Sequence, residues 1–221
     1  MDIHYILLDI CDTTINMQTA DRFVEFVLSK TSIRRKIKLY FLKSVKKKPF
    51  GYIILKKFGV RYKLKILEYL KSLSYDALDS LAKDYYEYEL KPKYNKDVIY
   101  FLEKFRHKAR VIIVSGGYDI YIKYIAADLG VDCFICSELK FHKGIFTGKL
   151  KDMDCMGINK VLLLEKRNIL GQLEFEKTAV LSDSISDLPL FSLGKYKIAV
   201  NPDRELKRLI GKGWYTIKEV M

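Results

Sequence analysis

The stretch "LLDICDTTIN", residues Leu7 to Asn16, decides how this chain folds. It continues an apolar run that begins before it, and the run stops abruptly at an aspartate, Asp9. A short apolar run of this kind indicates a buried strand of a parallel sheet, because both faces of such a sheet are covered. Asp9 would then stand at the carboxyl end of the strand, where open parallel sheets bind their ligands.

Strands and helices alternate along the rest of the chain. "RVIIVSGG", which begins at Arg110, is a β-branched run stopped by glycines, and "LKFHKGIFTGKL" is typical of a hairpin with Gly144 near its tip. We expect strands at 3–9, 110–115, 132–136, 177–183 and 196–200, and helices at 96–106, 119–129, 158–168, from 186 onward and at 204–210. This order favours an α/β fold, a Rossmann-like parallel sheet with helices on both faces.

The net charge of +13 is concentrated in one segment. Residues 30–71 contain 15 Lys and Arg against one acid, Glu68, which is +14 and leaves about −1 for the rest. Apolar spacing within the segment predicts amphipathic helices with a break at Pro49 and Gly51, and a further helical stretch from Tyr62 to about Glu89. We therefore predict a Rossmann-like core of residues 1–15 and 92–221 and an inserted all-helical, basic cap of residues 16–91. The apolar positions that set the first helices are Ile33, Ile37, Tyr40, Phe41, Ile53, Ile54 and Phe58.

Composition places the chain among cytoplasmic proteins with a sizeable core. It has 221 residues, 49% of them hydrophobic, with no apolar run long enough to span a bilayer and no recognisable leader. Its cysteines need no disulfides in such a compartment. "CFIC" has metal-like spacing, so a zinc site completed by His142 and Cys155 is an alternative to a buried strand. The cysteines are Cys11, Cys133, Cys136 and Cys155.

The ends of separate strands carry the candidate chemistry. Asp9 and Asp183 each follow an apolar run, and Ser115 stands before a pair of glycines. Since parallel strands end at the same edge of a sheet, these side chains should converge. Converging carboxylates repel each other unless a cation lies between them, and oxygen ligands suit Mg²⁺. The alternative for either aspartate alone is a helix cap or a solvent-facing loop residue.

These motifs, in this order, resemble those of the haloacid dehalogenase-like hydrolase superfamily, in its phosphoserine phosphatase-like branch. The first motif is "DICDT" at Asp9, the second is Ser115 in "VIIVSGG", and the third is a lysine that opens a helix, best matched by Lys160 in "GINKVLLL". The fourth is the acidic "DSISD" from Asp183 to Asp187. "GIFTG" resembles the flap of the family, "IAVNP" its following strand, and the basic insert falls where this branch carries its cap.

The resemblance implies a role for each matching residue. Asp9 would be the nucleophile that forms an aspartyl-phosphate, and Mg²⁺ would be held by Asp9, the Cys11 carbonyl and Asp183, with Asp187 supporting that shell. Ser115, Gly116 and Lys160 would hold the phosphoryl group. Lys143 and Lys149 are alternative candidates for the lysine.

One position departs from the family pattern. The phosphatases usually carry a second Asp two residues after the nucleophile, as the general acid–base, and here that residue is Cys11. Asp12 stands where glycine is usual. We expect a Mg²⁺-dependent phosphomonoester hydrolase with an altered acid–base group. The alternatives are a non-hydrolytic relative that binds a phosphorylated ligand and, less in keeping with the fourth motif, a dehalogenase.

The basic cap raises the question of a partner beyond a small phosphorylated substrate. A solvated charged face is the simplest interpretation. Interleaved aromatic residues also fit a helix on an anionic membrane surface, whereas no nucleic-acid motif accompanies the charge. No acidic residue of the cap is evidently placed to receive the amino group of phosphoserine. The interleaved aromatic residues are Tyr40, Phe41, Phe50, Tyr52, Phe58 and Tyr62.

Overall fold

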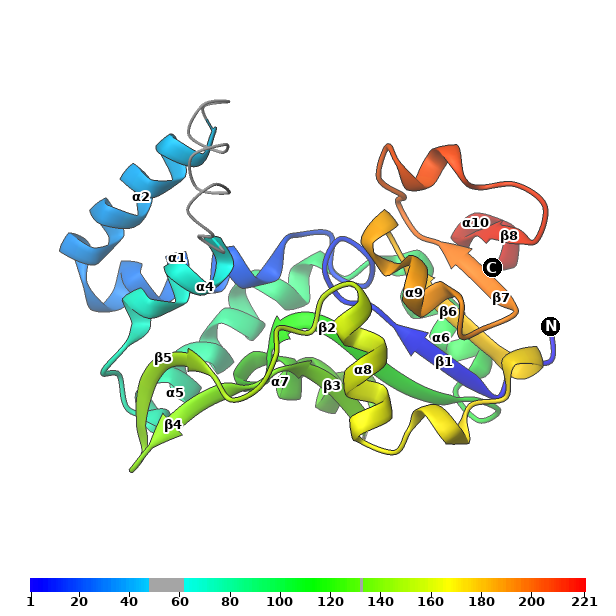
Figure 1. Ribbon diagram of the computed structural model, residues 1–221, viewed down its shortest axis with the longest axis horizontal. Helices are drawn as coiled ribbons and strands as arrows, with labels where there is room; N and C mark the ends of the chain where they lie inside the picture. Colours follow the sequence, from blue (N-terminus) through cyan, green and yellow to red (C-terminus); the bar gives the residue numbers. More distant parts are fainter. Residues whose placement is uncertain (48–61, 132) are drawn as a thin grey trace.

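A six-stranded parallel sheet forms the centre of the molecule (Figure 1). We describe residues 1–47, 62–131 and 133–221 of a computed structural model. The strand order is β3-β2-β1-β6-β7-β8, and every neighbouring pair is parallel. The strands are β1 (Tyr5–Leu8), β2 (Arg110–Tyr118), β3 (Cys133–Ser137), β6 (Thr178–Ser182), β7 (Tyr196–Ala199) and β8 (Trp214–Thr216).

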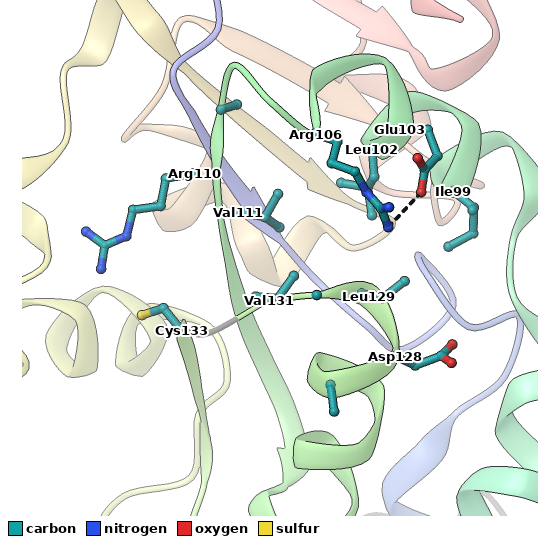
Figure 2. Close-up of a pocket in the computed structure, with 13 residues that line it drawn as sticks. Ile99, Leu102, Glu103, Arg106, Arg110, Val111, Asp128, Leu129, Val131 and Cys133 are labelled. Carbon is teal, nitrogen blue, oxygen red and sulfur yellow. Dashed lines mark ion pairs between the residues drawn. The ribbon is translucent and has the colours of Figure 1, made fainter.

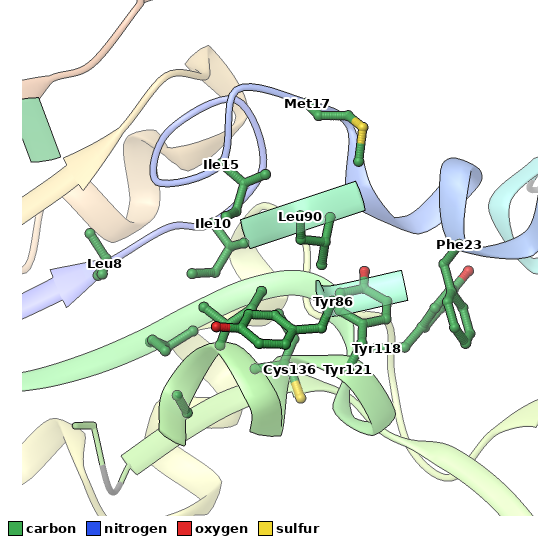
Figure 3. Packing of buried hydrophobic residues seen from close by; sticks show 14 of the residues in the cluster. Leu8, Ile10, Ile15, Met17, Phe23, Tyr86, Leu90, Tyr118, Tyr121 and Cys136 are labelled. Atoms are coloured by element: carbon green, nitrogen blue, oxygen red, sulfur yellow. The ribbon is translucent and has the colours of Figure 1, made fainter. Parts of the chain in front are cut away.

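Helices cover both faces of this sheet. Successive strand residues point to opposite faces, so Ile6 and Leu8 of β1 belong to one buried cluster and Leu7 to another. The first cluster includes residues of α6 (Lys96–Phe105), α7 (Asp119–Leu129) and α10 (Ile217–Val220), and part of it is shown in Figure 3. The second includes residues of α8 (Ile158–Lys166) and α9 (Leu188–Phe191). The predicted fold class is confirmed.

The insert is mostly helical in the residues that the structure describes, with a non-helical connection at 71–74. Its helices are α1 (Thr19–Thr31), α2 (Ile33–Lys47), α4 (Tyr62–Leu67) and α5 (Tyr75–Tyr85), with 3₁₀ turns at Glu68–Leu70 and Lys91–Lys93 and a π-helical turn at Tyr86–Leu90. In Figure 1 the insert lies beyond the carboxyl ends of the strands. No helix in the described part of the chain has the length and apolarity needed to cross a bilayer.

The prediction of one helical stretch from Tyr62 to Glu89 was wrong in its middle. Ser72 has a positive φ of 76°, which ends the first part, and Ser74 then caps α5 by accepting a hydrogen bond from the amide of Ala77 at 3.2 Å. The predicted break at Pro49 and Gly51 and the apolar positions Ile53, Ile54 and Phe58 lie outside the described residues.

The predicted hairpin is present, and it packs against the insert. It consists of β4 (Leu139–His142) and β5 (Ile145–Leu150), with Gly144 in the turn at a φ of 75°. Backbone hydrogen bonds join it to the segment before α5, with Phe146 N to Leu73 O at 2.8 Å and Tyr75 N to Gly144 O at 2.8 Å. The hairpin therefore extends the insert, although it lies far away in sequence.

Other element boundaries differ from the predictions at the end of the chain and at the strand ends. The helix predicted at 204–210 is only a 3₁₀ turn at Leu206–Arg208, and the side chain of Asp203 caps its start by accepting hydrogen bonds from the amides of Glu205 and Leu206. A 3₁₀ turn at Ile185–Asp187 precedes the short α9, and β2 continues beyond Ser115 through a register irregularity. Neither β8 nor α10 was predicted.

Candidate active site

The carboxyl ends of the strands meet at a cavity of about 290 Å³. Parallel strands bring distant segments together here, as Asp9 follows β1 and Asp183 follows β6, its direct neighbour in the sheet. The predicted site residues in the cavity wall are Asp9, Cys11, Gly116, Lys160, Asp183 and Asp187. The structure thus brings the first, second, third and fourth motifs to one place, although they span most of the chain.

A buried lysine joins two of the carboxylates. Lys160 Nζ donates to Asp9 Oδ1 at 2.7 Å and to Asp187 Oδ2 at 2.6 Å, and Ser182 Oγ donates to the same Asp187 oxygen at 2.6 Å. Burial alone would lower the pKa of Lys160, but the two carboxylates outweigh it, so the pKa lies above its ordinary value and the side chain is an ammonium. Burial raises the pKa of Asp9 to about 6 even beside this cation. Lys160 therefore fixes Asp9 at the end of β1.

Asp187 lies behind Lys160 rather than directly beside Asp183. Its side chain is 2% exposed, and one of its oxygens is shared between the Lys160 ammonium and the Ser182 hydroxyl. These contacts position the lysine. The metal-supporting role predicted for Asp187 stays a prediction.

Asp183 has no cationic partner among the described residues. Its side chain accepts a hydrogen bond from Thr13 Oγ1 at 3.2 Å, and it forms no ion pair within the described residues. Burial, followed by the carboxylates of Asp9 and Asp12, raises the pKa of Asp183 to about 7. The charged residues in the cavity wall are the carboxylates of Asp9, Asp21, Asp183 and Asp187 and the ammonium groups of Lys63 and Lys160.

This donor set fits a hard divalent cation. Carboxylates outnumber cations in the wall, so a phosphate dianion would meet net repulsion unless a further cation were bound. Within the described residues no cluster of three His, Cys, Asp or Glu side chains is arranged as a metal site. Mg²⁺ commonly binds through only one or two carboxylates and keeps several waters, so Asp9, Asp183 and the carbonyl of Cys11 suffice as candidates.

Cys11 occupies the position of the missing acid, and its thiol is bound away from any proton-transfer role. Its Sγ lies 3.0 Å from Thr19 Oγ1, which is in turn 2.8 Å from Tyr121 Oη. Burial, and then the negative charge of Asp9, raises the pKa of Cys11 to about 11. The thiol therefore stays protonated near pH 7, and a thiol with such a pKa is a weak acid catalyst.

Asp12, the other candidate for that role, takes an unusual backbone conformation. Its φ is 53°, in the left-handed region that favours glycine, and its Oδ2 accepts a hydrogen bond from Gln18 Nε2 at 2.5 Å. Asp12 does not line the cavity, whereas the preceding residue, Cys11, does. The structure therefore gives the role of the missing acid to neither residue.

The second motif, Ser115 with the two glycines after it, also lies at the candidate active site. Ser115 is fully buried, and its Oγ accepts a hydrogen bond from the amide of Gly117 at 3.1 Å, while Gly116 lines the cavity. A Cβ added at Gly117 would lie 2.8 Å from both Ile122 Cδ1 and Tyr121 Oη, so this position has no room for a side chain. The phosphate-binding roles of Ser115 and Gly116 stay predictions.

The structure adds a residue that the sequence analysis missed, Lys63 on α4 of the insert. Its Nζ donates to the carbonyl oxygen of Gly116 and to Asp154 Oδ1, and it lies 3.4 Å from Ser137 Oγ. Ser137 Oγ also donates to Asp154 Oδ1, at 2.7 Å. Lys63 thus ties the insert to the core at Gly116 and Asp154. In the sequence it was one of many lysines in a basic run, with no local feature to distinguish it.

The insert supplies further cavity residues, one of them acidic. Gln18, Asp21 and Tyr62 line this cavity and also a neighbouring one of about 650 Å³ between α1, α2 and α4. The sequence analysis found no acidic residue of the cap evidently placed to receive an amino group. The structure corrects this, because Asp21 lies in the wall of the cavity that contains Asp9.

The alternatives weighed from the sequence do not assemble into sites. Cys133 packs with one core cluster and Cys136 with the other, so the two cysteines face opposite sides of the sheet and cannot share a zinc ion. Lys143 and Lys149 are exposed on the hairpin, whereas Lys160 is 3% exposed and bonded to Asp9.

A larger cavity of about 750 Å³ lies at the opposite, amino-terminal ends of β2 and β3 (Figure 2). Its charged wall residues include Arg106 and Glu103, which pair with each other at 3.0 Å. Apart from Cys133, which belongs to the unsupported zinc alternative, it contains no candidate residue from the sequence, so the cavity at Asp9 is the candidate active site.

Comparisons with known proteins agree with this geometry. The model of the family described as haloacid dehalogenase-like hydrolase matches residues 7–192. A phosphoserine phosphatase of Albidiferax ferrireducens is 29% identical over 105 residues, which is 45% of this chain and 44% of that protein. Across the curated relatives that we compared, the matched region spans only 30% to 44% of the relative's length.

Solved structures extend the similarity in fold over the whole chain. A Bordetella pertussis protein of unknown function has a TM-score of 0.80 at 15% identity, with 98% of each chain covered. A substrate-bound phosphoserine phosphatase complex has a TM-score of 0.67 at 18% identity, covering 100% of this chain and 97% of that one.

Proposed function

The chain belongs to the haloacid dehalogenase-like hydrolase family, and we propose that it is a Mg²⁺-dependent phosphatase of the phosphoserine phosphatase-like branch that acts on a phosphomonoester. The observation that supports this best is the arrangement around Asp9. Lys160 holds one of its oxygens at 2.7 Å, and Asp183 and Gly116 line the same cavity. A fixed carboxylate next to phosphate-binding groups is suited to nucleophilic attack on phosphorus.

In the first step, Asp9 attacks the phosphorus atom, and the bond to the ester oxygen breaks. The leaving oxygen takes a proton, and an aspartyl-phosphate remains on Asp9. Lys160, the hydroxyl of Ser115 and the amide of Gly116 would hold the phosphoryl oxygens as charge shifts among them. In the second step, water adds to phosphorus, Asp9 is released as a carboxylate and inorganic phosphate leaves.

Asp9, Asp183 and the Cys11 carbonyl would hold Mg²⁺, which would offset the negative charge of the phosphoryl group when bound. Thr13 already orients Asp183 through its hydroxyl, and Asp187 orients Lys160. The insert closes one side of the cavity through Lys63, which reduces access of bulk water to Asp9.

With Cys11 in place of an acidic residue, we expect slow turnover. In the extreme case the protein binds its phosphorylated ligand without efficient hydrolysis. Both steps move a proton at the leaving oxygen or the attacking water, and the thiol of Cys11 is directed to Thr19 instead. Loss of such help costs about 10²–10⁴ in rate. The second step should suffer as much as the first, so the aspartyl-phosphate should accumulate.

The test is a single-turnover reaction with an aryl phosphate and Mg²⁺, quenched with acid. We expect phosphorylation of Asp9, found by peptide mass spectrometry, and slow release of phosphate. Asp9→Asn should abolish both signals, because an amide oxygen is a poor nucleophile. Phosphate release without a modified Asp9 peptide, undiminished in Asp9→Asn, would refute the proposed nucleophile. Binding of phosphate esters with no Asp9 modification in either protein would favour the binding protein.

A further inference from the structure

The second helix of the insert, α2, uses only a narrow face for packing. Leu39 is fully buried and Leu42 packs against the same core cluster, while the neighbouring residues on this face are partly exposed. Helix α2 contacts α1, and in Figure 1 it lies at the end of the molecule away from the sheet. Most of its circumference therefore faces solvent.

Large apolar side chains form a stripe on that exposed side. Ile33, Ile37 and Phe41 follow one another at intervals of four residues, so they share one face of the helix, and Tyr40 lies beside them. Their exposed fractions are 72% for Ile33, 63% for Ile37 and 73% for Phe41. Contiguous exposed apolar side chains on a soluble domain mark a surface that meets a partner.

The charge around this stripe is entirely positive. The 15 residues of α2 contain no acidic side chain. Arg35 donates to the backbone carbonyls of Tyr69 and Lys71 at 3.0 Å each, so it holds α2 in place. Arg34 and Lys38 are exposed next to the apolar stripe on its Phe41 side, and Lys36 lies on the other side, with its Nζ 5.9 Å from the centre of the Tyr40 ring.

An amphipathic helix with an apolar stripe and basic flanks fits an anionic lipid surface, because the acyl boundary accepts the apolar side chains and the headgroups attract the charges. A second copy of this chain would bring the same positive charge and be repelled. A nucleic acid would use the basic residues but offers its backbone no apolar groove for Ile33, Ile37 and Phe41.

Two adjoining cavities lie between α2 and Asp9. The cavity of about 650 Å³ is lined by Tyr40, Lys43 and Ser44 of α2, and it shares the wall residues Gln18, Asp21 and Tyr62 with the cavity at Asp9. Helix α2 therefore borders a cavity that is next to the candidate active site.

We propose that α2 docks on an anionic membrane surface, with Ile33, Ile37 and Phe41 inserted at the headgroup boundary. Docking would bring the cavity of about 650 Å³ close to the lipid surface. If the proposed phosphatase function holds, the preferred substrate is a phosphomonoester carried by an amphiphile in that surface. Docking itself does not depend on catalysis, so its test can succeed or fail separately.

The test is co-sedimentation of the full chain with vesicles of phosphatidylcholine alone or mixed with phosphatidylglycerol, at low and high salt. We expect binding only to the mixed vesicles, and weaker binding at high salt. The double variant Arg34→Ala/Lys38→Ala should weaken partitioning by about 30-fold at low salt, which corresponds to about 2 kcal/mol. The double variant Lys96→Ala/Lys108→Ala, which removes exposed charge from the core, is the matched control and should bind like the parent.

A second pair of variants tests the apolar stripe. Ile37→Ser/Phe41→Ser should weaken partitioning tenfold or more, because these side chains would leave the acyl boundary. Phe175→Ser/Leu209→Ser removes apolar side chains that are 50% exposed elsewhere and should have no effect. Circular dichroism and thermal melting check that each variant is folded.

The proposal is overturned if the parent binds neither kind of vesicle at low salt. It is also overturned if Ile37→Ser/Phe41→Ser binds like the parent, since charge alone would then explain the binding, or if the control variants lose as much affinity as the α2 variants. If the parent hydrolyses a soluble phosphate ester but does not bind vesicles, the catalytic proposal stands and the docking proposal fails.

Discussion

Replacing Cys11 with aspartate tests whether the missing acid limits this enzyme. The side chain at this position lines the cavity that contains Asp9, so a carboxyl there would be near the leaving oxygen. Because the pKa of Cys11 is raised to about 11, the thiol is a weak proton donor to the leaving oxygen at pH 7. The same burial would raise the pKa of a carboxyl, as it raises that of Asp9 to about 6, and a pKa near the working pH is best for general acid catalysis.

The expected gain from Cys11→Asp is about 10²–10⁴ in kcat/KM for an alkyl phosphate, the usual contribution of a general acid–base. An aryl phosphate should gain less, because its leaving group needs less protonation. The assay is phosphate release from both substrate types with Mg²⁺, together with acid-quench detection of the aspartyl-phosphate. The intermediate should accumulate less in the variant, because the new carboxylate activates water in the second step.

The controls separate acid catalysis from changes in shape. Cys11→Asn has nearly the same shape and cannot donate an acidic proton, so it should gain nothing. Asp12→Gly combined with Cys11→Asp removes a neighbouring carboxylate and suits the φ of 53° at position 12. If the folded double variant hydrolyses every ester tested at the parental rate, the missing acid is not the defect and the binding role becomes the better account. If Cys11→Asn gains as much as Cys11→Asp, a change of shape and not acid catalysis explains the gain.

Further predictions concern the buried charges. Lys63→Met should destabilise the protein by about 1–3 kcal/mol in urea denaturation, because it leaves Asp154 without its cation. Adding Asp154→Asn should restore part of this stability. An unchanged urea midpoint in the single variant would contradict the ion pair. Lys160→Met should cost about 3–5 kcal/mol at pH 8, because its carboxylate partners lose their shared cation, and less at pH 5, where Asp9, whose pKa is raised to about 6, can protonate; equal losses at both pH values would argue against this charge network. Burial raises the pKa of Asp119 from 3.8 to about 6, so the folded state binds more protons than the unfolded state and stability should fall as the pH rises from about 4 to about 6. Asp119→Asn should flatten that part of the urea-midpoint profile, and a profile unchanged by the substitution would show that another group causes the fall.

The sequence by itself determined the fold class and the position of the site. Strand formation at residues 5–8 follows from a local apolar run, and the end of that run at Asp9 marks the ligand-binding edge. The end of a second apolar run also singled out Asp183, and the resemblance to a known family pointed to Lys160 and to the departure at Cys11. The prediction was wrong at 204–210, where only a 3₁₀ turn at Leu206–Arg208 forms, because the extension of a short helix depends on tertiary packing more than on local propensity.

Only the tertiary structure decided which charges meet. Lys160 and Asp9 are 151 residues apart in sequence and Lys63 and Asp154 are 91 apart, and no periodicity of a helix or strand encodes such pairs. The thiol of Cys11 is directed to Thr19 because α1 packs against the core at that point. In the sequence the apolar residues of α2 predict an amphipathic helix, but hydrophobic spacing marks one face of a helix without showing what covers it. The structure leaves Ile37 and Phe41 exposed, because burial depends on the neighbouring elements that the fold brings to a face, and α1 covers only the side of α2 that carries Leu39.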